Sequence, residues 1–460
     1  MRYKIDYEKK IKELLEKQNK QYTYYIETMG CALNENDSMK YAGILEEMGF
    51  YKAKDIKEAN VVVFNTCCIR ENAEDKLFGR LGLLKSRKIP NKDMYIAIVG
   101  CMTEQGHILE KIKKSYPFVD VVLGTKSMQY FAEKLYIAMK DKKKTQDIQV
   151  NEHEIVEDVP IKYEQGYKAS ISIIYGCNNF CSYCIVPYVR GRERSRLPQD
   201  ILKDVKEVAS KGYKEITLLG QNVNSYGNDF KEEKYTFVDL LKEIEKVEGI
   251  EVIRFVSPHP KDFTDELIDK IASSSKIAKQ IHLPLQSGST KILHSMNRKY
   301  TKEHFLKLVD KIRGKIPNVS FSTDIIVGFP GETEQDFLDT MEVVEKTRFD
   351  QIYMFCYSIR KGTRAEKMEN QVEEKIKVER LERLKALFEN IIDEENEKKV
   401  GTIENILVEG VSKNNSDMYT GRTMDNKVVV FEGIVQDVGK MKKIEIIKNN
   451  KWYLTGKILD

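Results

Sequence analysis

The sequence predicts an α/β protein in three parts: an N-terminal α/β domain, a partial (β/α)6 barrel, and a small all-β barrel at the C-terminal end. Short runs rich in β-branched residues alternate with longer segments of helical periodicity, which is the pattern of parallel strands joined by helices. After residue 400 the composition changes to short strand-like runs separated by turn residues. A chain of 460 residues has room for about three domains.

The composition narrows the class of protein. A net charge of +4 permits a nucleic-acid partner through a local basic face but does not require one. The apolar runs are shorter than the roughly 18 residues of a membrane span, so we expect a protein without a membrane anchor. Eight cysteines without an apolar signal core indicate a reducing compartment, and we expect a cytoplasmic location.

Pattern and composition give an expected division of the chain. It comprises a short, charged, solvated helical extension at 1–21, the α/β domain at 22–140, a linker at 141–162, the partial barrel at 163–395, and the all-β barrel at 396–460.

The N-terminal domain carries three cysteines in equivalent places. Strand-like runs at 24–30, 61–66 and 96–100 are followed directly by Cys31, Cys67 and Cys101, with helical stretches between them (38–48, 73–85 and 106–114). In a parallel sheet the carboxyl ends of the strands meet at one edge, where ligands collect. The three thiols are therefore expected to converge on one site.

The alternative is that these cysteines are small buried hydrophobic residues. Three cysteines in register at strand ends favour a metal cluster over packing. Cys67 and Cys68 are not expected to ligate the same cluster, because adjacent side chains of an extended segment point in opposite directions. Cys356 ends an apolar run and is expected to lie in the core.

Six strand-like runs with intervening helices predict the partial barrel. The runs are 169–175, 215–219, 252–256, 280–285, 319–327 and 351–357, and the helices are 198–211, 237–247, 264–273, 302–316 and 333–346. Active-site residues of such barrels lie at the carboxyl ends of the strands.

A Cys-x3-Cys-x2-Cys motif follows the first of these strands at Cys177, Cys181 and Cys184. Three thiolates can hold an iron–sulfur cluster but leave one iron without a cysteine ligand. Zinc is disfavoured because no histidine lies between His153 and His259, and disulfides are disfavoured because nothing indicates export. The motif resembles that of the radical S-adenosylmethionine enzymes, in which the cofactor binds the open iron and yields a 5′-deoxyadenosyl radical.

Polar or glycine residues follow several of the later barrel strands. As candidates for binding S-adenosylmethionine we select Gln221, Asn222, Ser257, Asp324 and Gly328. Each of them could equally be an ordinary loop residue. His259 and His282 are assigned no metal role.

Two further segments are candidates for RNA contact. Arg190, Arg192 and Arg194 follow the cysteine motif and could receive phosphates or form a solvated, salt-bridged surface. In the C-terminal part, an amphipathic helix at 373–399 precedes strands at 403–408, 427–431, 443–447 and 452–454. A small β-barrel of this kind often binds nucleic acid, here by stacking and phosphate pairing from Tyr419, Arg422 and Phe431.

Local motifs make the whole chain similar to the radical S-adenosylmethionine methylthiotransferases. The motifs are Asn65-Thr66-Cys67-Cys68-Ile69-Arg70-Glu71-Asn72-Ala73, Ser257-Pro258-His259-Pro260, Tyr357-Ser358-Ile359-Arg360-Lys361-Gly362-Thr363 and Gly421-Arg422-Thr423. The resemblance implies an N-terminal cluster domain, a radical barrel and a C-terminal TRAM domain. Gly220-Gln221-Asn222 departs from the Gly-Gly-Glu of many radical enzymes, which leaves the ligand of the cofactor's amino end open.

The resemblance also implies two 4Fe–4S clusters. Cys177, Cys181 and Cys184 match the ligands of the cluster that cleaves the cofactor, named here the radical cluster. Cys31, Cys67 and Cys101 match the ligands of a second cluster that carries sulfur, named here the auxiliary cluster.

The implied reaction is transfer of a methylthio group to carbon 2 of an N(6)-isopentenyladenosine beside the tRNA anticodon, with two molecules of S-adenosylmethionine per turnover. The tRNA anticodon stem-loop is then the partner, a flavodoxin or ferredoxin the reductant, and a monomer the expected state. Arg70-Glu71 and Gly421-Arg422-Thr423 favour this branch. The alternatives are methylthiolation of threonylcarbamoyladenosine in tRNA, methylthiolation of a ribosomal-protein aspartate, or a noncatalytic iron–sulfur scaffold that binds RNA.

Overall fold

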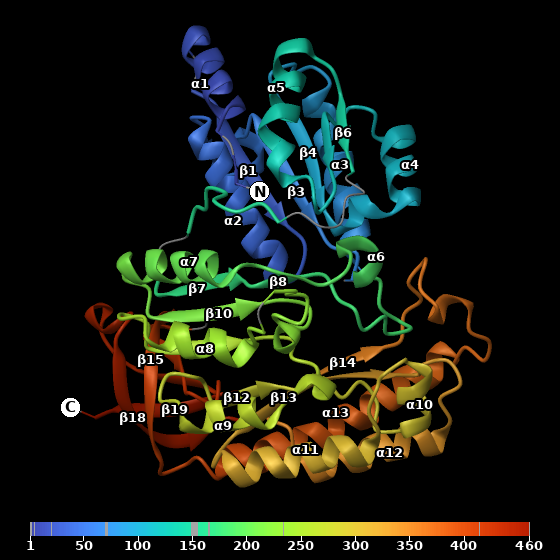
Figure 1. Cartoon of the computed structure of the whole chain (residues 1–460), viewed down its shortest axis with the longest axis vertical. Coiled ribbons are helices and arrows are strands. Elements are labelled where there is room, and N and C mark those ends of the chain that lie inside the picture. The colour runs from blue at the N-terminus through green and yellow to red at the C-terminus, as the bar shows by residue number, and fades with distance from the viewer. Residues whose placement is uncertain are drawn as a thin grey trace. The chain divides into compact units, whose positions relative to one another are not determined.

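A computed structural model describes residues 2–3, 5–19, 21–69, 72–148, 155–163, 166–232, 234–413 and 415–459. The chain forms two compact units (Figure 1). The N-terminal unit consists of residues 1–165, 175–178 and 185–196, and the C-terminal unit of residues 166–174, 179–184 and 197–460. No helix in the described part of the chain is long and apolar enough to cross a membrane.

The N-terminal unit is built on a six-stranded parallel sheet in the order β2-β1-β3-β4-β5-β6. Its strands are β1 (Thr23–Thr28), β2 (Tyr51–Lys52), β3 (Val61–Thr66), β4 (Tyr95–Gly100), β5 (Val121–Leu123) and β6 (Thr145–Asp147). Its helices are α1 (Tyr7–Gln18), α2 (Ala32–Glu47), α3 (Ala73–Lys88), α4 (Gly106–Ser115), α5 (Phe131–Asp141) and α6 (Val186–Arg190). Every residue of β3 and β4 is buried, because helices cover both faces of the sheet (Figure 1).

Two segments of this unit differ from expectation. The N-terminal helix α1 is not a solvated extension, because Ile11 and Leu15 are buried in the core formed with α2 and α5. The sheet also continues into the segment predicted as a linker, since β6 pairs in parallel with β5 through Asp147. The burial of one face of α1 could have been predicted from Ile11 and Leu15, which are apolar and spaced four residues apart. The many charged residues of this helix indicated a solvated helix instead.

The C-terminal unit begins with the predicted partial barrel. Two parallel sheets, β7-β10-β11 and β12-β13-β14, are connected by a bridge between Ile253 and Ile277. The strands are β7 (Lys168–Ser172), β10 (Glu215–Leu219), β11 (Val252–Phe255), β12 (Gln280–His282), β13 (Ser320–Val327) and β14 (Gln351–Cys356). The helices are α7 (Pro198–Ser210), α8 (Phe237–Glu245), α9 (Asp265–Ser273), α10 (Thr290–Ser295), α11 (Lys302–Lys315), α12 (Glu334–Thr347) and α13 (Glu374–Glu397), which leads into the last domain (Figure 1).

The all-β part is a closed five-stranded barrel in the order β15-β16-β17-β19-β18. Its strands are β15 (Ile403–Ser412), β16 (Asn415–Arg422), β17 (Val428–Glu432), β18 (Met441–Asn449) and β19 (Leu454–Ile458). The sequence predicts a turn where β16 begins, because the first residues of this strand are polar and show no apolar alternation. In the structure these residues belong to the strand and are exposed. Phe431 is fully buried in the core of this barrel, so the prediction that it stacks on RNA is wrong.

Polar contacts attach this small barrel to the amino ends of the strands of the large one. Lys427 Nζ lies 2.7 Å from Asp350 Oδ1, and Ser320 Oγ donates to the Asp425 carbonyl at 2.7 Å. Arg254 donates to the Thr423 carbonyl at 3.1 Å. The attachment leaves the carboxyl ends of the strands, where barrel enzymes place their chemistry, on the side away from the small barrel.

Candidate metal centres and cofactor site

The three cysteines of the N-terminal unit lie at the carboxyl ends of three adjacent parallel strands. Cys31 is the N-cap residue of α2, shortly after β1. Cys67 follows β3 directly, and Cys101 follows β4 directly. Since β1, β3 and β4 are neighbours in the sheet, the predicted convergence of the strand ends is present. Cys67 and Cys101 are buried, and Cys31 is half-buried.

A glycine allows the chain to approach closely beside Cys101. Gly100 has a φ of +98°, and a Cβ there would lie 2.5 Å from Asn65 Oδ1 and 2.6 Å from the Thr66 carbonyl oxygen. Both contacts are far shorter than van der Waals distance, so any side chain would push apart the ends of β3 and β4. Because Gly100 has no side chain, the segments that carry Cys67 and Cys101 can lie close together.

Polar partners surround the Cys101 sulfur. The Cys68 thiol hydrogen-bonds to it, and Arg190 Nε donates to it at 3.1 Å. The Cys68 hydrogen bond, aided by the Arg190 charge, lowers the pKa of the Cys101 thiol below its ordinary value. Cys68 packs against Cys101, and the expectation that Cys67 and Cys68 do not both ligate one cluster stays a prediction.

The donor set fits a cluster better than a single ion. Within the described ranges, no group of three or more His, Cys, Asp or Glu side chains is close enough to hold one metal ion. In a 4Fe–4S cluster each thiolate binds a different iron, so the sulfurs stand further apart than around one ion. Thiols at three adjacent strand ends beside a buried guanidinium suit such an anionic group.

The division between the two units passes through the Cys-x3-Cys-x2-Cys loop. Cys177 belongs to the N-terminal unit, where its amide donates to the Gly191 carbonyl at 3.1 Å. Cys181 and Cys184 belong to the C-terminal unit and are joined by a turn in which the Cys184 amide donates to the Cys181 carbonyl at 2.9 Å. Phe180, with a φ of +47°, turns the chain before Cys181.

The segment after α10 fixes this turn. The Ser182 amide donates to the Met296 carbonyl at 2.9 Å, and Asn297 Nδ2 donates to the carbonyl oxygen of Phe180 at 2.9 Å. Arg298 is buried, and one of its guanidinium nitrogens lies 3.5 Å from Cys181 Sγ. A buried cation beside the Cys181 sulfur favours an anionic cluster on these thiols. Sequence reasoning missed Arg298, because nothing in Asn297-Arg298-Lys299-Tyr300 indicates burial.

Four of the five residues selected for cofactor binding lie just beyond the carboxyl ends of strands, and Asp324 lies inside one. Gln221 is half-buried, and Asn222 is buried and donates to Asp262 at 2.9 Å just beyond β10. Ser257, beyond β11, has a φ of +58°, a left-handed conformation that costs a non-glycine residue of the order of 1–3 kcal/mol. Asp324 lies within β13 and its carboxylate is 3.4 Å from His282 Nε2. Binding of the cofactor by these five residues stays a prediction.

Gly328 occupies the tight turn that follows β13. Its φ is +71°, and its amide donates to Glu332 Oε1 at 2.8 Å. A Cβ there would lie 2.3 Å from Cγ of Lys377. The ammonium group of Lys377 donates to the Tyr357 carbonyl at 3.0 Å. The turn and the start of α13 therefore fit together only with glycine at this position.

Replacing Gly328 by alanine is expected to destabilise the C-terminal unit. The left-handed backbone costs alanine about 1–2 kcal/mol, and displacement of Lys377 adds about 1–3 kcal/mol. Gly331 is the matched control, since its φ is +79° but a Cβ at this position would meet no atom within 4 Å, so only the backbone cost applies. Urea unfolding followed by Trp452, the single tryptophan, measures both variants. Equal midpoints for the two variants would contradict the packing argument.

His259 is unsuited to proton transfer. Burial, reinforced by the positive charges of Arg298 and Lys261, lowers the pKa of His259 far below its ordinary value. Its Nδ1 accepts a hydrogen bond from the Lys261 amide at 3.3 Å, and its ring packs edge-on against Tyr300. The neutral ring thus has a structural role in the Ser257–Pro260 segment.

The arginines predicted to contact RNA have different environments. Arg190 is 5 % exposed and is engaged by internal partners, so the prediction that it binds phosphate is wrong. Arg192 is exposed. Arg194 is half-buried and donates to the Arg190 carbonyl at 3.1 Å. Arg422 lies 3.4 Å from Glu409 and donates to the Asn426 carbonyl at 3.2 Å. The RNA contacts of Arg192, Arg194 and Arg422 stay predictions, and Arg70 and Glu71 lie outside the described residues.

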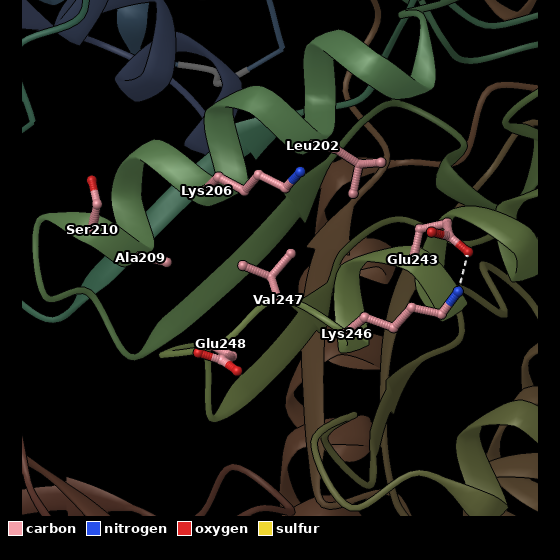
Figure 2. Close-up of a pocket in the computed structure, with 8 residues that line it drawn as sticks. All are labelled: Leu202, Lys206, Ala209, Ser210, Glu243, Lys246, Val247 and Glu248. Carbon is pink, nitrogen blue, oxygen red and sulfur yellow. Dashed lines mark hydrogen bonds and ion pairs between the residues drawn. The ribbon is translucent and has the colours of Figure 1, made fainter.

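A hollow of about 610 Å³ on the C-terminal unit lies between helices α7 and α8 (Figure 2). It is lined by Leu202, Lys206, Ala209, Ser210, Glu243, Lys246, Val247 and Glu248. Apart from Leu202, which lies earlier in α7, these residues belong to the C-terminal halves of the two helices or follow α8. Because each helix runs back toward the amino ends of the strands, the hollow is at the opposite end from Gln221, Ser257 and Gly328. It is therefore separate from the candidate cofactor-binding residues.

Three families of known proteins match successive parts of the chain. Uncharacterized protein family UPF0004 matches residues 23–124, the Radical SAM superfamily matches residues 171–344, and the TRAM domain matches residues 397–459.

Full-length relatives are also similar to the chain. A tRNA-2-methylthio-N(6)-dimethylallyladenosine synthase of Thermoanaerobacter pseudethanolicus is 47 % identical over 98 % of this chain and 96 % of its own length. Proteins of the same name from Clostridium botulinum and Acetivibrio thermocellus are 49 % and 48 % identical, over 94 % and 99 % of this chain and 96 % and 94 % of their own lengths.

Solved structures agree on the fold. The radical S-adenosylmethionine methyltransferase TsrM of Kitasatospora setae, with cobalamin and a [4Fe-4S] cluster bound, is similar with a TM-score of 0.56, 14 % identity, and coverage of 75 % of this chain and 77 % of its own. The cobalamin-dependent S-adenosylmethionine radical enzyme OxsB gives a TM-score of 0.54 and 13 % identity, with coverage of 82 % of this chain and 57 % of its own.

Proposed function

This chain belongs to the family of the tRNA-2-methylthio-N(6)-dimethylallyladenosine synthases, and from that membership we propose that it adds a methylthio group to carbon 2 of N(6)-isopentenyladenosine beside the tRNA anticodon. The observation that carries the proposal is the combination of near full-length identity with two separate cysteine triads. Cys177, Cys181 and Cys184 form one triad and Cys31, Cys67 and Cys101 the other.

The two triads would hold one 4Fe–4S cluster each. When bound, the clusters and S-adenosylmethionine supply the radical that removes the hydrogen from carbon 2 and the sulfur and methyl group that replace it. Three cysteines per cluster leave one iron open, which an electron carrier with four-cysteine ligation would not have. This difference argues against the noncatalytic scaffold.

The chain's own residues position these groups. Gly100 holds the ends of β3 and β4 together at the auxiliary site. Asn297 and Arg298 position the start of the turn that joins Cys181 to Cys184, by hydrogen bonds to the Phe180 carbonyl and to the Cys181 sulfur. The proposed contacts of S-adenosylmethionine are Gln221, Asn222, Ser257 and Gly328, just beyond the strand ends that barrel enzymes use for catalysis, and Asp324 within β13.

The substrate class follows from the chemistry of the target carbon. Carbon 2 of adenine carries no acidic proton, so general acid–base catalysis by side chains cannot activate it. A base must also leave its stack to reach an enclosed reactive group, which favours an unpaired loop such as the anticodon loop over a duplex. We propose that the TRAM barrel contributes to holding the tRNA and that Arg192, Arg194 and Arg422 contact it. The further proposals are a flavodoxin or ferredoxin as reductant, a cytoplasmic location and a monomeric state.

Nucleoside mass spectrometry tests the proposed substrate. The reconstituted, reduced protein is incubated with S-adenosylmethionine, a sulfide source and tRNA that carries isopentenyladenosine but lacks the methylthio group. We expect isopentenyladenosine to disappear and a nucleoside heavier by one CH2S unit to appear.

Two parallel reactions distinguish the alternatives. The same assay uses tRNA that carries threonylcarbamoyladenosine and ribosomal protein that carries the candidate aspartate. Product in either of these, with isopentenyladenosine unchanged, would refute the proposed substrate while leaving methylthiolation intact.

A further inference from the structure

Arg190 is a buried cation at the C-terminal end of α6, in the N-terminal unit. Only 5 % of the residue is exposed, and its side chain makes three polar contacts. Its Nε donates to Cys101 Sγ at 3.1 Å, and a terminal nitrogen donates to Asn34 Oδ1 at 3.1 Å and to Asp37 Oδ2 at 3.2 Å. Burying a guanidinium is costly unless anionic or strongly polar partners surround it, so this arrangement needs a reason.

The same network reaches all three segments that carry the auxiliary-cluster cysteines. Asn34 accepts from Arg190, and the Cys31 thiol lies 3.5 Å from the same oxygen. Asn34 Nδ2 donates to the carbonyl oxygen of Thr66, the residue before Cys67, at 3.0 Å. One arginine and one asparagine therefore join the segments of Cys31, Cys67 and Cys101.

The fold fixes the direction of the guanidinium. Helix α6 packs on Cys101 through Ile185 and Val189, and the Val189 carbonyl accepts a hydrogen bond from Thr125 Oγ1 at 2.8 Å. Arg190 follows at the end of this anchored helix. Its planar, forked donor group suits simultaneous contact with a sulfur, an amide oxygen and a carboxylate better than a lysine ammonium would.

We propose that Arg190 is a positioning residue of the auxiliary cluster, which orients the Cys101 ligand and raises the reduction potential of the cluster by donating a charge-assisted N–H···S hydrogen bond. The inference rests on the proposed function, because it assumes a cluster on Cys31, Cys67 and Cys101. Hydrogen bonds to ligand sulfurs and nearby positive charge stabilise the more negative, reduced state of an iron–sulfur cluster. Asp37 works against this effect, because its carboxylate draws on the same cation.

The test measures the auxiliary cluster by itself in the full-length chain. In a Cys177→Ala/Cys181→Ala/Cys184→Ala background, iron content and a redox titration followed by electron paramagnetic resonance report only on this cluster. With Arg190→Gln we expect the ratio of reduced to oxidised cluster at a fixed potential to fall at least about tenfold, a shift of about 59 mV for one electron. Arg190→Lys, which keeps the charge, should restore part of the loss.

Two further variants give the test its direction and control. Asp37→Asn should move the potential the opposite way, since Arg190 keeps its charge and loses its carboxylate partner. Arg196→Gln breaks a comparably buried ion pair, with Glu157, and should leave the potential and spectrum unchanged.

Three outcomes would overturn the inference. Unchanged potential and spectrum in Arg190→Gln with iron retained would make the residue purely structural. Equal shifts in Arg190→Gln and Arg196→Gln would assign the effect to general loosening of the unit. Absence of iron from the parent background would refute the auxiliary cluster and this inference with it, whereas a normal potential series with no tRNA product would refute only the proposed substrate. If Arg190→Gln fails to assemble the cluster, the Arg190→Lys and Asp37→Asn pair decides by the sign of its shifts.

Discussion

Replacing Cys31, Cys67 and Cys101 together by alanine is expected to lower the iron content of the anaerobically reconstituted protein from about eight to about four atoms per chain. The three residues lie at the carboxyl ends of adjacent strands, so their loss removes one complete ligand set. The triad at Cys177, Cys181 and Cys184 is untouched, and reductive cleavage of S-adenosylmethionine should continue. Methylthiolated tRNA should fall below detection, because the sulfur-carrying site is gone. Iron and sulfide analysis, 5′-deoxyadenosine release and nucleoside mass spectrometry measure the three effects.

Cys356→Ala is the matched control for this triple variant. Cys356 is a half-buried cysteine at the carboxyl end of a parallel strand, β14, and belongs to neither triad. Its replacement should leave about eight irons and full product. About four irons in both the wild type and the triple variant would show that the N-terminal cysteines are structural and would end the methylthiolation hypothesis for this chain. Cys68→Ala adds a separate comparison, because the Cys68 thiol hydrogen-bonds to Cys101.

The parts of the site that sequence predicted are those that depend on local order along the chain. Cys67 and Cys101 end buried strands of β-branched residues, and the alternation of strands with helices sets those strands parallel. Parallel order alone brings their carboxyl ends to one edge. The adjacency of the strand ends that carry these cysteines could therefore be predicted without any knowledge of tertiary contacts.

The parts that sequence did not predict depend on partners far along the chain. Arg190 lies in a basic run that is typical of a solvated surface, yet Asn34 and Asp37, more than 150 positions earlier, bury it. Arg298 likewise pairs with Cys181 across 117 positions. A buried arginine leaves no periodic pattern in the sequence. Its burial depends on whether the tertiary fold places an anionic group or a sulfur beside the guanidinium.

In the small barrel, too, local composition does not predict structure that depends on pairing with distant residues. Strand β16 begins with polar, exposed residues, and its pairing with β15 and β17, rather than its own composition, makes it a strand. Phe431 and Tyr419 are direct partners in that ladder and so lie on the same face, where Phe431 is fully buried and the half-buried Tyr419 packs against the same core. Which aromatic residues of a barrel face solvent depends on register, and composition could not supply the register.

Replacing Cys181 by alanine should abolish reductive cleavage of S-adenosylmethionine. Cys181 is the middle ligand of the Cys-x3-Cys-x2-Cys motif, and its sulfur lies 3.5 Å from the buried Arg298 guanidinium. Two cysteines cannot hold a 4Fe–4S cluster firmly, and Arg298 would lose an anionic partner. We expect 5′-deoxyadenosine release to fall by more than about a hundredfold and iron to fall to about four atoms per chain.

The Cys181→Ala variant and the triple variant are expected to lose the same quantity of iron but different activities. This difference distinguishes two clusters that act in one reaction from one catalytic and one structural cluster. If one triad served catalysis and the other only stability, cleavage would fail in one variant and folding in the other. If two clusters act in sequence, the triple variant cleaves the cofactor without product, whereas Cys181→Ala neither cleaves nor forms product. Cleavage that survives in Cys181→Ala at the wild-type rate would contradict the assignment of the radical cluster. If Cys181→Ala loses cleavage and product while the triple variant loses only product, both triads are needed for one reaction. Methylthiolation of an unactivated carbon requires this.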